Sequence, residues 1–527
     1  MLLLNKLNLN RLALILSFLL PMILYLFTLM PGLGWGDSAY LALAVFNKKF
    51  EFFARSGHAV YVLTGEWFNR LFFIQPDLTY NLNLLSAVYG CLALLVFYFT
   101  LLKLTGSPGT GLLTALILAG SHTFWFLSVI ADSYSLFALT TILQIYLLLC
   151  LKDSQKFYYF ILLLLAMAIG FFNHMLTALF APFFIILAYL WFSKKRKITY
   201  VLLLTGLAGS IFLFFTAAGT DSIRLFFRGI QEVYQRYFRL DRIFHELLFY
   251  PLKLWYQFPL AIILAITGFN KIWKTNRWLC LFLSLINLSV ILFAACYQHP
   301  ARAFNLLIIS FTITALFIGA GWNEWRRRFK PLVRTAIAFL LIISSPICYY
   351  ALPRIADTYG IRIAPSDWTV PHNGSNLYFM QPYKKGDNSP AKFATHVLNK
   401  VSGDDLLMGD EFSFGPVWYY YHTRNATVSP VSPAGGKGEF INPKKYYLNI
   451  LIPQVFFERR LSKTEIWTII KQSIEQKLSD GRKVYLLQPA DLIFFTTEGP
   501  FDVTNLIKYD YEIVPNGLIY EIKLKGK

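Results

Sequence analysis

Long apolar segments recur along the first two thirds of this chain and constrain its fold more than any other feature. An α-helix needs about 20 predominantly apolar residues to cross the hydrocarbon core of a bilayer. Segments of about that length recur from the N-terminus to about residue 353 and then stop. We therefore predict a polytopic α-helical membrane protein with about eleven transmembrane helices. They lie near residues 12–30, 82–102, 110–130, 134–151, 157–172, 175–192, 198–218, 259–273, 279–297, 304–322 and 332–352.

The composition favours the same class of protein. Of the 527 residues, 56% are hydrophobic, 17% aromatic and only 15% charged, whereas a soluble globular chain carries about 25% charged residues. Water-soluble domains could not bury so much apolar surface. The composition therefore argues against a cytosolic cofactor-binding enzyme, a disordered tail and a secreted disulfide scaffold. The five cysteines lie in or beside apolar runs and show no metal-ligand spacing.

The charge distribution predicts the orientation in the membrane. The chain has 49 basic and 29 acidic residues, a net charge of +20, which in a soluble protein would suggest a nucleic-acid partner. Here the loops on one side of the predicted helices hold seventeen basic residues and only two acidic ones, Asp153 and Glu324. Basic residues in short loops favour the cytoplasmic side. We therefore predict an integral protein of the plasma or inner membrane with a cytoplasmic N-terminus, and no nucleic-acid partner.

This orientation divides the chain into two domains. Residues 1–353 form the transmembrane domain, with outer loops at 31–81 and 219–258, and residues 354–527 lie outside the cytoplasm. In the outer region a helix-like run, Ser462–Leu478, alternates with strand-like runs such as Lys483–Leu487. We therefore predict a compact extracytoplasmic α/β domain at the C-terminus.

Two outer carboxylates occupy unusual positions at the ends of predicted spans. Asp37 follows Gly34-Trp35-Gly36, and Asp132 lies in a tight turn between two spans. A carboxylate at the lip of a span is costly unless water, a partner or a substrate compensates its charge. Both residues suit general-base chemistry on a hydroxyl group. The alternatives are ordinary turn chemistry for Asp37 and a helix N-cap for Asp132.

Several outer basic residues are candidates for binding an anionic group. Arg302 at an outer turn could bind a phosphate through its planar guanidinium, or it could contact lipid headgroups. The second outer loop carries arginines, including Arg228 and Arg236, among apolar residues. That pattern is typical of an amphipathic helix at the interface, which either anchors the loop or holds lipid-linked substrate. His58 and His174 also lie in outer connections, without metal-ligand spacing.

A series of short motifs over residues 30–180 resembles the integral-membrane glycosyltransferases of the GT-C superfamily, specifically the DUF2723 branch with its O-mannosyltransferase-like proteins. The matching stretches are Gly36-Asp37-Ser38, Tyr61–Gly65, Asn83–Ala87, Leu104–Ser107, Thr123–Trp125, Ala131–Leu136 and Asn173-His174. The chain departs from the branch in two places. Tyr40 stands where an acid is usual, and Ala54–Gly57 replace a His-Pro-Pro-Gly sequence. These departures are also compatible with an altered substrate or with a lost activity.

The resemblance implies a GT-C-like fold and sugar transfer from a polyprenyl-phosphate donor to an acceptor hydroxyl, with inversion at the anomeric carbon. Asp37 then corresponds to the catalytic acid/base residue, and Asp132 assists it. We expect His58, Asn173, His174, Arg302, Arg228 and Arg236 to bind substrate. Membrane lipid and a protein, lipid or glycan acceptor are the expected partners. The sequence has no nucleotide-binding motif, so the lipid-linked sugar is the expected donor, with no cofactor and no assigned metal site.

Two other functions fit a polytopic protein with an outer domain. A lipid-linked glycan transporter or flippase would more often show internal repeats and mid-helix charges, and neither is evident. A non-catalytic assembly protein would use its outer domain. There Gly409–Phe412 and Tyr419–His422 would form either a carbohydrate-binding edge or packed strands and turns.

Overall fold

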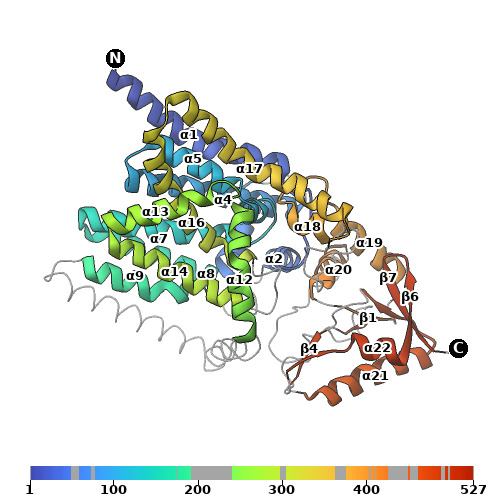
Figure 1. Cartoon of the computed structure of the whole chain (residues 1–527). Coiled ribbons are helices and arrows are strands. Elements are labelled where there is room, and N and C mark those ends of the chain that lie inside the picture. Colours follow the sequence, from blue (N-terminus) through green and yellow to red (C-terminus); the bar gives the residue numbers. More distant parts are fainter. Residues whose placement is uncertain are drawn as a thin grey trace.

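The computed structural model has a helical membrane part and a smaller C-terminal part with a β-sheet (Figure 1). The structure describes residues 2–48, 58–72, 77–174, 176–191, 240–296, 304–361, 375–402, 405–409, 411–424, 449–451, 461–487, 493–496 and 499–525.

Helices cover ten of the eleven predicted membrane segments. In chain order, the helices of the membrane part are α1 (Leu2–Thr28), α2 (Asp37–Phe46), α3 (Ala59–Leu71), α4 (Leu78–Thr105), α5 (Pro108–Ala119), α6 (His122–Val129), α7 (Tyr134–Ser154), α8 (Phe157–Asn173), α9 (Thr177–Trp191), α12 (Leu240–Gln257), α13 (Ile262–Thr275), α14 (Arg277–Cys296), α16 (Ile308–Trp325), the short 3-10 helix η1 (Arg326–Arg328) and α17 (Pro331–Thr358). The segment predicted at 198–218 lies outside the described residues. The polytopic helical fold is confirmed, and the number of spans stays a prediction.

The described helices differ in how much of their apolar surface is buried within the protein. Five of them, α1, α4, α7, α14 and α17, are long and apolar enough to cross a membrane. Two bent pairs would raise the number to seven: α5 and α6 meet at 70°, and α12 and α13 at 106°. The apolar windows of α4 and α7 are 72% and 83% buried, whereas those of α1 and α17 are 22% and 17% buried. α4 and α7 therefore form the centre of the bundle, and α1 and α17 present apolar side chains outward.

Glycines allow two membrane helices to touch backbone to backbone. A Cβ added to Gly268 on α13 would lie 1.7 Å from the carbonyl oxygen of Phe317 on α16. A Cβ added to Gly321 on α16 would lie 2.0 Å from the carbonyl oxygen of Leu264 on α13. Small residues at such crossings let the two backbones approach closely. The resulting van der Waals packing drives helix association in lipid, where no hydrophobic driving force acts between helices.

The C-terminal part holds a mixed five-stranded sheet in the order β2-β1-β3-β7-β6. β1 pairs in parallel with β2 and β3, and β7 is antiparallel to β3 and β6. The elements of this part are α18 (Ser375–Met380), α19 (Ser389–Lys400), β1 (Leu406–Met408), α20 (Glu411–Arg424), β2 (Asn449–Leu451), α21 (Lys463–Ser479), β3 (Val484–Leu486), β4 (Ile493–Thr496), β5 (Gly499–Asp502), α22 (Thr504–Asp510), β6 (Tyr511–Asn516) and β7 (Ile519–Leu524). The predicted α/β character of this region is confirmed, whereas the boundary at residue 353 stays a prediction.

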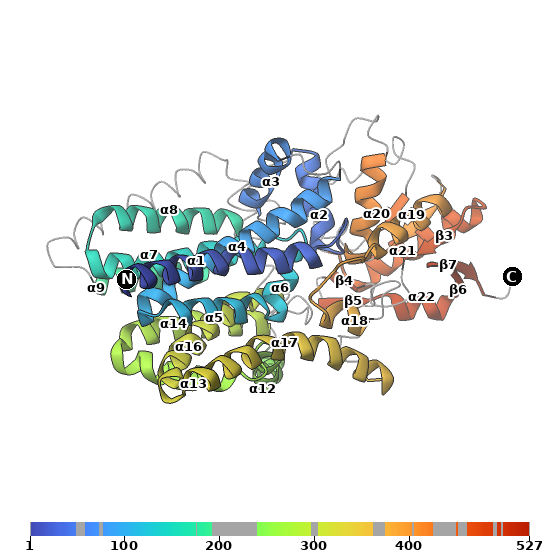
Figure 2. The same ribbon diagram turned by 90° about the horizontal axis from the view of Figure 1, so that it is seen from above.

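The alternation of side chains along β1 gives the sheet two apolar faces. Leu406 and Met408 pack with the isoleucines of α21, because neighbouring strand residues point to opposite faces. Leu407 points the other way and belongs to a cluster that includes Phe393 of α19 and Trp35 before α2. We call this cluster the shared core, since residues of the first outer loop and of the C-terminal part build it together. In Figure 2, α2 accordingly lies between the membrane helices and α20.

The close contact of α13 and α16 predicts the effect of a single methyl group. We expect Gly268→Ala to lower the free energy of unfolding by about 1–3 kcal/mol, because the added carbon overpacks the backbone contact. Gly109→Ala in α5 is the matched control, since nothing lies within 4 Å of its Cβ position and alanine is the better helix former. Thermal unfolding in detergent measures both. Equal stability of the two variants would contradict the contact.

Candidate functional site

Asp37 begins α2 after an unusual backbone turn. It follows Gly36, whose φ of 64° lies in the left-handed region that favours glycine. A Cβ at Gly36 would also lie 2.8 Å from the ring of Phe412 on α20. The Phe412 ring stacks on Trp35, with ring centroids 5.9 Å apart and planes 9° apart. The turn that presents Asp37 therefore depends on a glycine and on a ring from the C-terminal part.

Tyr40, the first departure from the GT-C pattern, lies where α2 meets α20. A Cβ added to Gly415 of α20 would lie 3.4 Å from the Tyr40 ring and 3.1 Å from the Cβ of Ala39. The tyrosine is thus part of a close helix contact. The other departure, Ala54–Gly57, lies outside the described residues.

Asp132 lies in the buried turn between α6 and α7, and α4 holds that turn. The backbone N–H of Asp132 donates to Ser86 Oγ at 3.2 Å, and Asn83 Oδ1 accepts from the Ala131 N–H at 2.6 Å. The Asn83 amide also donates to the carbonyl of Met30 at 2.9 Å. Asp132 Oδ1 lies 3.4 Å from the Tyr134 nitrogen. One asparagine of α4 thus ties this turn to the first outer loop.

The structure brings His58, Asn173 and His174 together beside that turn. The Nδ1–H of His58 donates to the carbonyl of Asn173 at 2.7 Å, and the two histidine rings lie 5.3 Å apart between centroids. The Asn173 amide donates to the carbonyl of Ser133 at 3.1 Å, next to Asp132. His174 Nδ1 accepts from the Leu176 N–H at 3.3 Å, so its proton is assigned to Nε2.

Electrostatics link the two carboxylates to the same group of side chains. Burial lowers the pKa of His58, and the hydrogen bond to the Asn173 carbonyl and the charge of Asp37 oppose this shift. Burial also raises the pKa of Tyr378 on α18, and Asp387 and Asp132 raise it further against a hydrogen bond from the Trp35 backbone. Asp37 therefore acts on His58, and His58 is linked to the turn of Asp132 through the hydrogen bonds of Asn173.

Lys384 is a buried cation at this end of the fold that sequence reasoning missed. Its side chain donates to the carbonyls of Tyr378 and Gln381, and its backbone N–H donates to the Thr28 carbonyl at 3.0 Å. The ammonium also lies 4.2 Å from the Tyr378 ring centroid and 5.0 Å from that of Phe126. Burial lowers the pKa of Lys384 to about 7, partly offset by Asp387. A single lysine in a polar stretch gives no sequence signal for such a position.

The predicted arginines Arg302, Arg228 and Arg236 lie outside the described residues, so their roles stay predictions. Within the described ranges, no group of three His, Cys, Asp or Glu side chains is arranged to hold a metal ion.

Most of Gly409–Phe412 and Tyr419–His422 lies on a packed helix, α20, where Phe412, Trp418 and Tyr419 pack in or against the shared core. The expected strand and turn structure is wrong, because residues 411–424 are helical. The carbohydrate-binding edge, the other alternative, stays a prediction.

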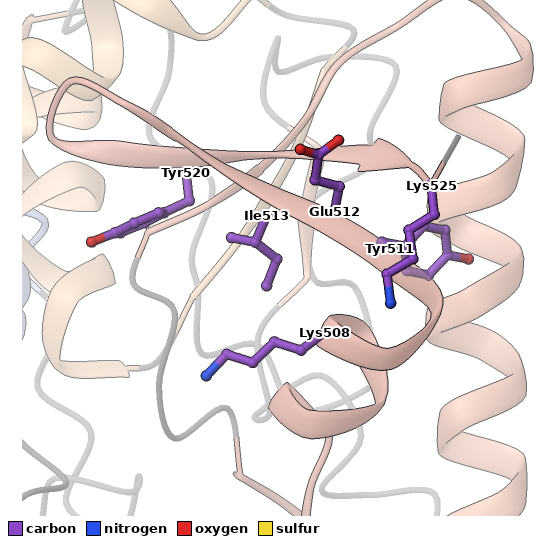
Figure 3. Close-up of a pocket in the computed structure, with 6 residues that line it drawn as sticks. All are labelled: Lys508, Tyr511, Glu512, Ile513, Tyr520 and Lys525. Atoms are coloured by element: carbon purple, nitrogen blue, oxygen red, sulfur yellow. The ribbon is translucent and has the colours of Figure 1, made fainter. Parts of the chain in front are cut away.

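A recess of about 400 Å³ lies on the C-terminal sheet, and none of its lining residues belongs to the candidate site. Figure 3 shows Lys508 of α22 below Ile513 and Tyr520 to the left of Ile513, while Glu512 points to the other side of the ribbon. Ile513 and Tyr520 pack against the cluster of α21, on the opposite face of the sheet from the shared core.

The first part of the candidate site coincides with a known family model. The model described as "Protein O-mannosyl-transferase TMEM260 N-terminal domain" matches residues 37–199. The matched stretch begins at Asp37 and includes Asp132, Asn173 and His174. No curated protein sequence matches the chain.

The fold is similar to that of ArnT from Cupriavidus metallidurans. The match to its apo structure covers 99% of this chain and 98% of ArnT, with a TM-score of 0.52 and 12% identity. The match to ArnT bound to undecaprenyl phosphate covers 96% and 97%, with a TM-score of 0.51 and 11% identity. A smaller likeness, with a TM-score of 0.44, 12% identity and coverage of 77% and 61%, is to the Archaeoglobus fulgidus oligosaccharyltransferase. The predicted resemblance to GT-C glycosyltransferases and the predicted GT-C-like fold are confirmed, and the family-model match over residues 37–199 supports a glycosyltransferase.

The turn before Asp37 predicts a test of the Phe412 contact. We expect Gly36→Ala to cost about 1–2 kcal/mol from the left-handed backbone and a further 1–3 kcal/mol from overpacking against Phe412. The matched control is Gly36→Ala in a Phe412→Ala background, because the backbone at residue 36 is the same and the ring that the added Cβ would meet is removed. Thermal unfolding of the single and double variants separates the backbone cost from the overpacking cost. An equal cost of Gly36→Ala with and without the Phe412 ring would contradict the contact.

The buried His174 predicts a loss of stability in acid. Burial, and then His58, hold its pKa well below 6.5 in the folded protein. Above pH 6.5 the ring is neutral in both states. Below pH 6.5 the unfolded chain takes up a proton that the folded chain does not, so the free energy of unfolding falls by about 1.4 kcal/mol per pH unit until the folded pKa is reached.

Thermal unfolding between pH 7.5 and 5.5 tests this dependence. His174→Phe keeps an aromatic ring beside Phe137, whose centroid lies 4.6 Å away, and should make the pH dependence less steep. His58, whose pKa burial also lowers, supplies part of the dependence that remains. His245→Phe is the control, since His245 is exposed on α12 and should leave the dependence unchanged. A dependence as steep in His174→Phe as in the wild type would contradict the contribution of His174.

Proposed function

We propose that this protein transfers a sugar from a polyprenyl-phosphate donor to an acceptor hydroxyl at the membrane face that carries the C-terminal part. The observation that carries the proposal is the meeting of two acidic turns at one end of an ArnT-like fold. Asp37 acts on His58, which bonds to Asn173, and Asn173 bonds to the turn of Asp132. One of the similar ArnT structures has undecaprenyl phosphate bound, which supports a lipid phosphate as the leaving group.

In this proposal Asp37 is the general base. Its carboxylate takes the proton of the acceptor hydroxyl while the acceptor oxygen forms a bond to the anomeric carbon of the sugar. The bond between that carbon and the phosphate oxygen breaks, and the electron pair leaves with the lipid phosphate. Attack from the side opposite the leaving group inverts the anomeric configuration. General-base assistance of this kind contributes about 10²–10⁴-fold to the rate.

The neighbouring residues divide the remaining tasks. Asp132 orients the acceptor or assists Asp37. His58 and His174, kept neutral by burial, and Asn173 hydrogen-bond sugar hydroxyls. Arg302, with Arg228 and Arg236 of the second outer loop, neutralises the departing phosphate, where fixed positive charge stabilises the developing anion.

The topology of the proposal follows the distribution of basic loops. The N-terminus lies in the cytoplasm, and residues 354–527 form an extracytoplasmic domain above the transmembrane domain 1–353. The acceptor is a hydroxyl of a protein, lipid or glycan that reaches the outer face.

Replacing the proposed base tests the function. In membranes supplied with a labelled polyprenyl-phosphate sugar, we expect Asp37→Asn to lower transfer at least 100-fold, because asparagine cannot accept the proton. Asp77→Asn is the matched control. Asp77 is also an outer carboxylate, but it caps α4 by accepting from the Thr79 N–H at 2.8 Å, and asparagine caps equally well.

The outcomes separate the three functions. Full transfer by Asp37→Asn, with normal amounts of folded protein, would remove the base assignment. Movement of a lipid-linked glycan across sealed vesicles without a covalent product would indicate a transporter. Neither transfer nor transport by the wild type would favour a non-catalytic assembly protein.

A further inference from the structure

A recess of about 230 Å³ lies at the ends of the membrane helices opposite Asp37 and Asp132. Lys103 near the end of α4 lines it, whereas Asp77, at the start of the same helix, borders the first outer loop. A straight helix of this length spans roughly 40 Å. The recess and the candidate site therefore face opposite surfaces of the membrane. We call it the basal recess.

The rim of the basal recess is polar and mainly basic. Lys103, Lys152 and Lys271 line it together with a single acid, Asp153. Lys103 pairs with Asp153 at 2.7 Å, and Lys271 pairs at 3.1 Å with Glu324 on α16. Lys152 forms no ion pair with a described residue, and its ammonium lies 5.1 Å from the centroid of the Trp191 ring. Its charge is therefore not neutralised within the described part of the chain.

The wall of the basal recess toward the bundle is apolar. Leu104, Leu149, Ile272, Leu279 and Ala320 contribute to it from five different helices. A cationic rim above an apolar wall, at the level where membrane helices end, fits an amphiphile with a negative headgroup. A free anion would find no partner in the apolar wall. Basic pockets between transmembrane helices on the cytoplasmic side characteristically bind anionic lipid headgroups.

We propose that the basal recess binds the phosphodiester headgroup of an anionic membrane lipid, with Lys152 as its principal cation. In the orientation proposed above, this lipid belongs to the cytoplasmic leaflet. The site is independent of sugar transfer, because it lies at the other membrane surface and uses none of the residues of the candidate site.

Retention of lipid by the purified full-length protein tests the proposal. The protein is delipidated in detergent, titrated with phosphatidylglycerol or phosphatidylcholine and examined by native mass spectrometry. We expect the wild type to bind one phosphatidylglycerol in preference to phosphatidylcholine, and Lys152→Gln to weaken that binding about fivefold. Lys330→Gln is the matched control, because Lys330 is exposed at the start of α17 and does not line the recess.

Three results would overturn the assignment. Equal binding of the two lipids by the wild type would remove the preference for an anionic headgroup. An equal effect of Lys152→Gln and Lys330→Gln would show general surface charge instead of a site. Displacement of phosphatidylglycerol by millimolar glycerol phosphate would indicate a soluble phosphate ligand. Thermal unfolding of each variant verifies that it is folded.

Discussion

The packing of Trp35 in the shared core is the interaction on which the end of the molecule that carries the candidate site depends. Its ring contacts those of Phe393 and Phe412, with centroids 5.4 Å and 5.9 Å away, and its indole N–H donates to Ser389 at 3.1 Å. Burying an aromatic side chain of this size stabilises a fold by roughly 4–6 kcal/mol, whereas a single hydrogen bond contributes about 1 kcal/mol. Apolar packing against the C-terminal helices, more than any polar contact of the first loop, therefore fixes the backbone before Asp37.

Polar contacts of α4 complete this arrangement within the bundle. The Asn83 side-chain nitrogen donates to the carbonyls of Met30 and Gly32, and its oxygen accepts from the N–H of Ala131. Leaving such buried groups without hydrogen bonds would cost about 1–3 kcal/mol each. The Asn83 amide therefore fixes the position of the first loop relative to the α6–α7 turn. The candidate site is thus built by three parts of the chain: the first outer loop, two interhelical turns of the bundle, and the helices that follow α17.

The sequence predicted the helices and singled out candidate site residues, because both depend on local patterns. Apolar runs marked ten segments that the described helices cover, and the predicted outer carboxylates and histidines stood out where polar groups are costly. The shared core could not be predicted, because periodicity shows which face of an element is apolar but not which distant element covers it. For the same reason Lys384 gave no signal, and the contact of Phe412 with the first loop was not expected. Gly409–Phe412 and Tyr419–His422 were assigned to a carbohydrate-binding edge or to strands and turns, although residues 411–424 form α20. The neutral state of His174 likewise depends on packing by Phe137 and Tyr134.

In the proposed sugar transferase, the C-terminal helices hold the proposed base, Asp37. Sugar transfer by Phe412→Ala in membranes tests this dependence, with Tyr509→Ala as control because Tyr509 is an exposed aromatic residue of α22. We expect Phe412→Ala to lower transfer at least tenfold, about 1.4 kcal/mol in the barrier, while the folded protein persists and Tyr509→Ala remains active. Transfer at the wild-type rate by Phe412→Ala would show that Asp37 does not depend on these helices.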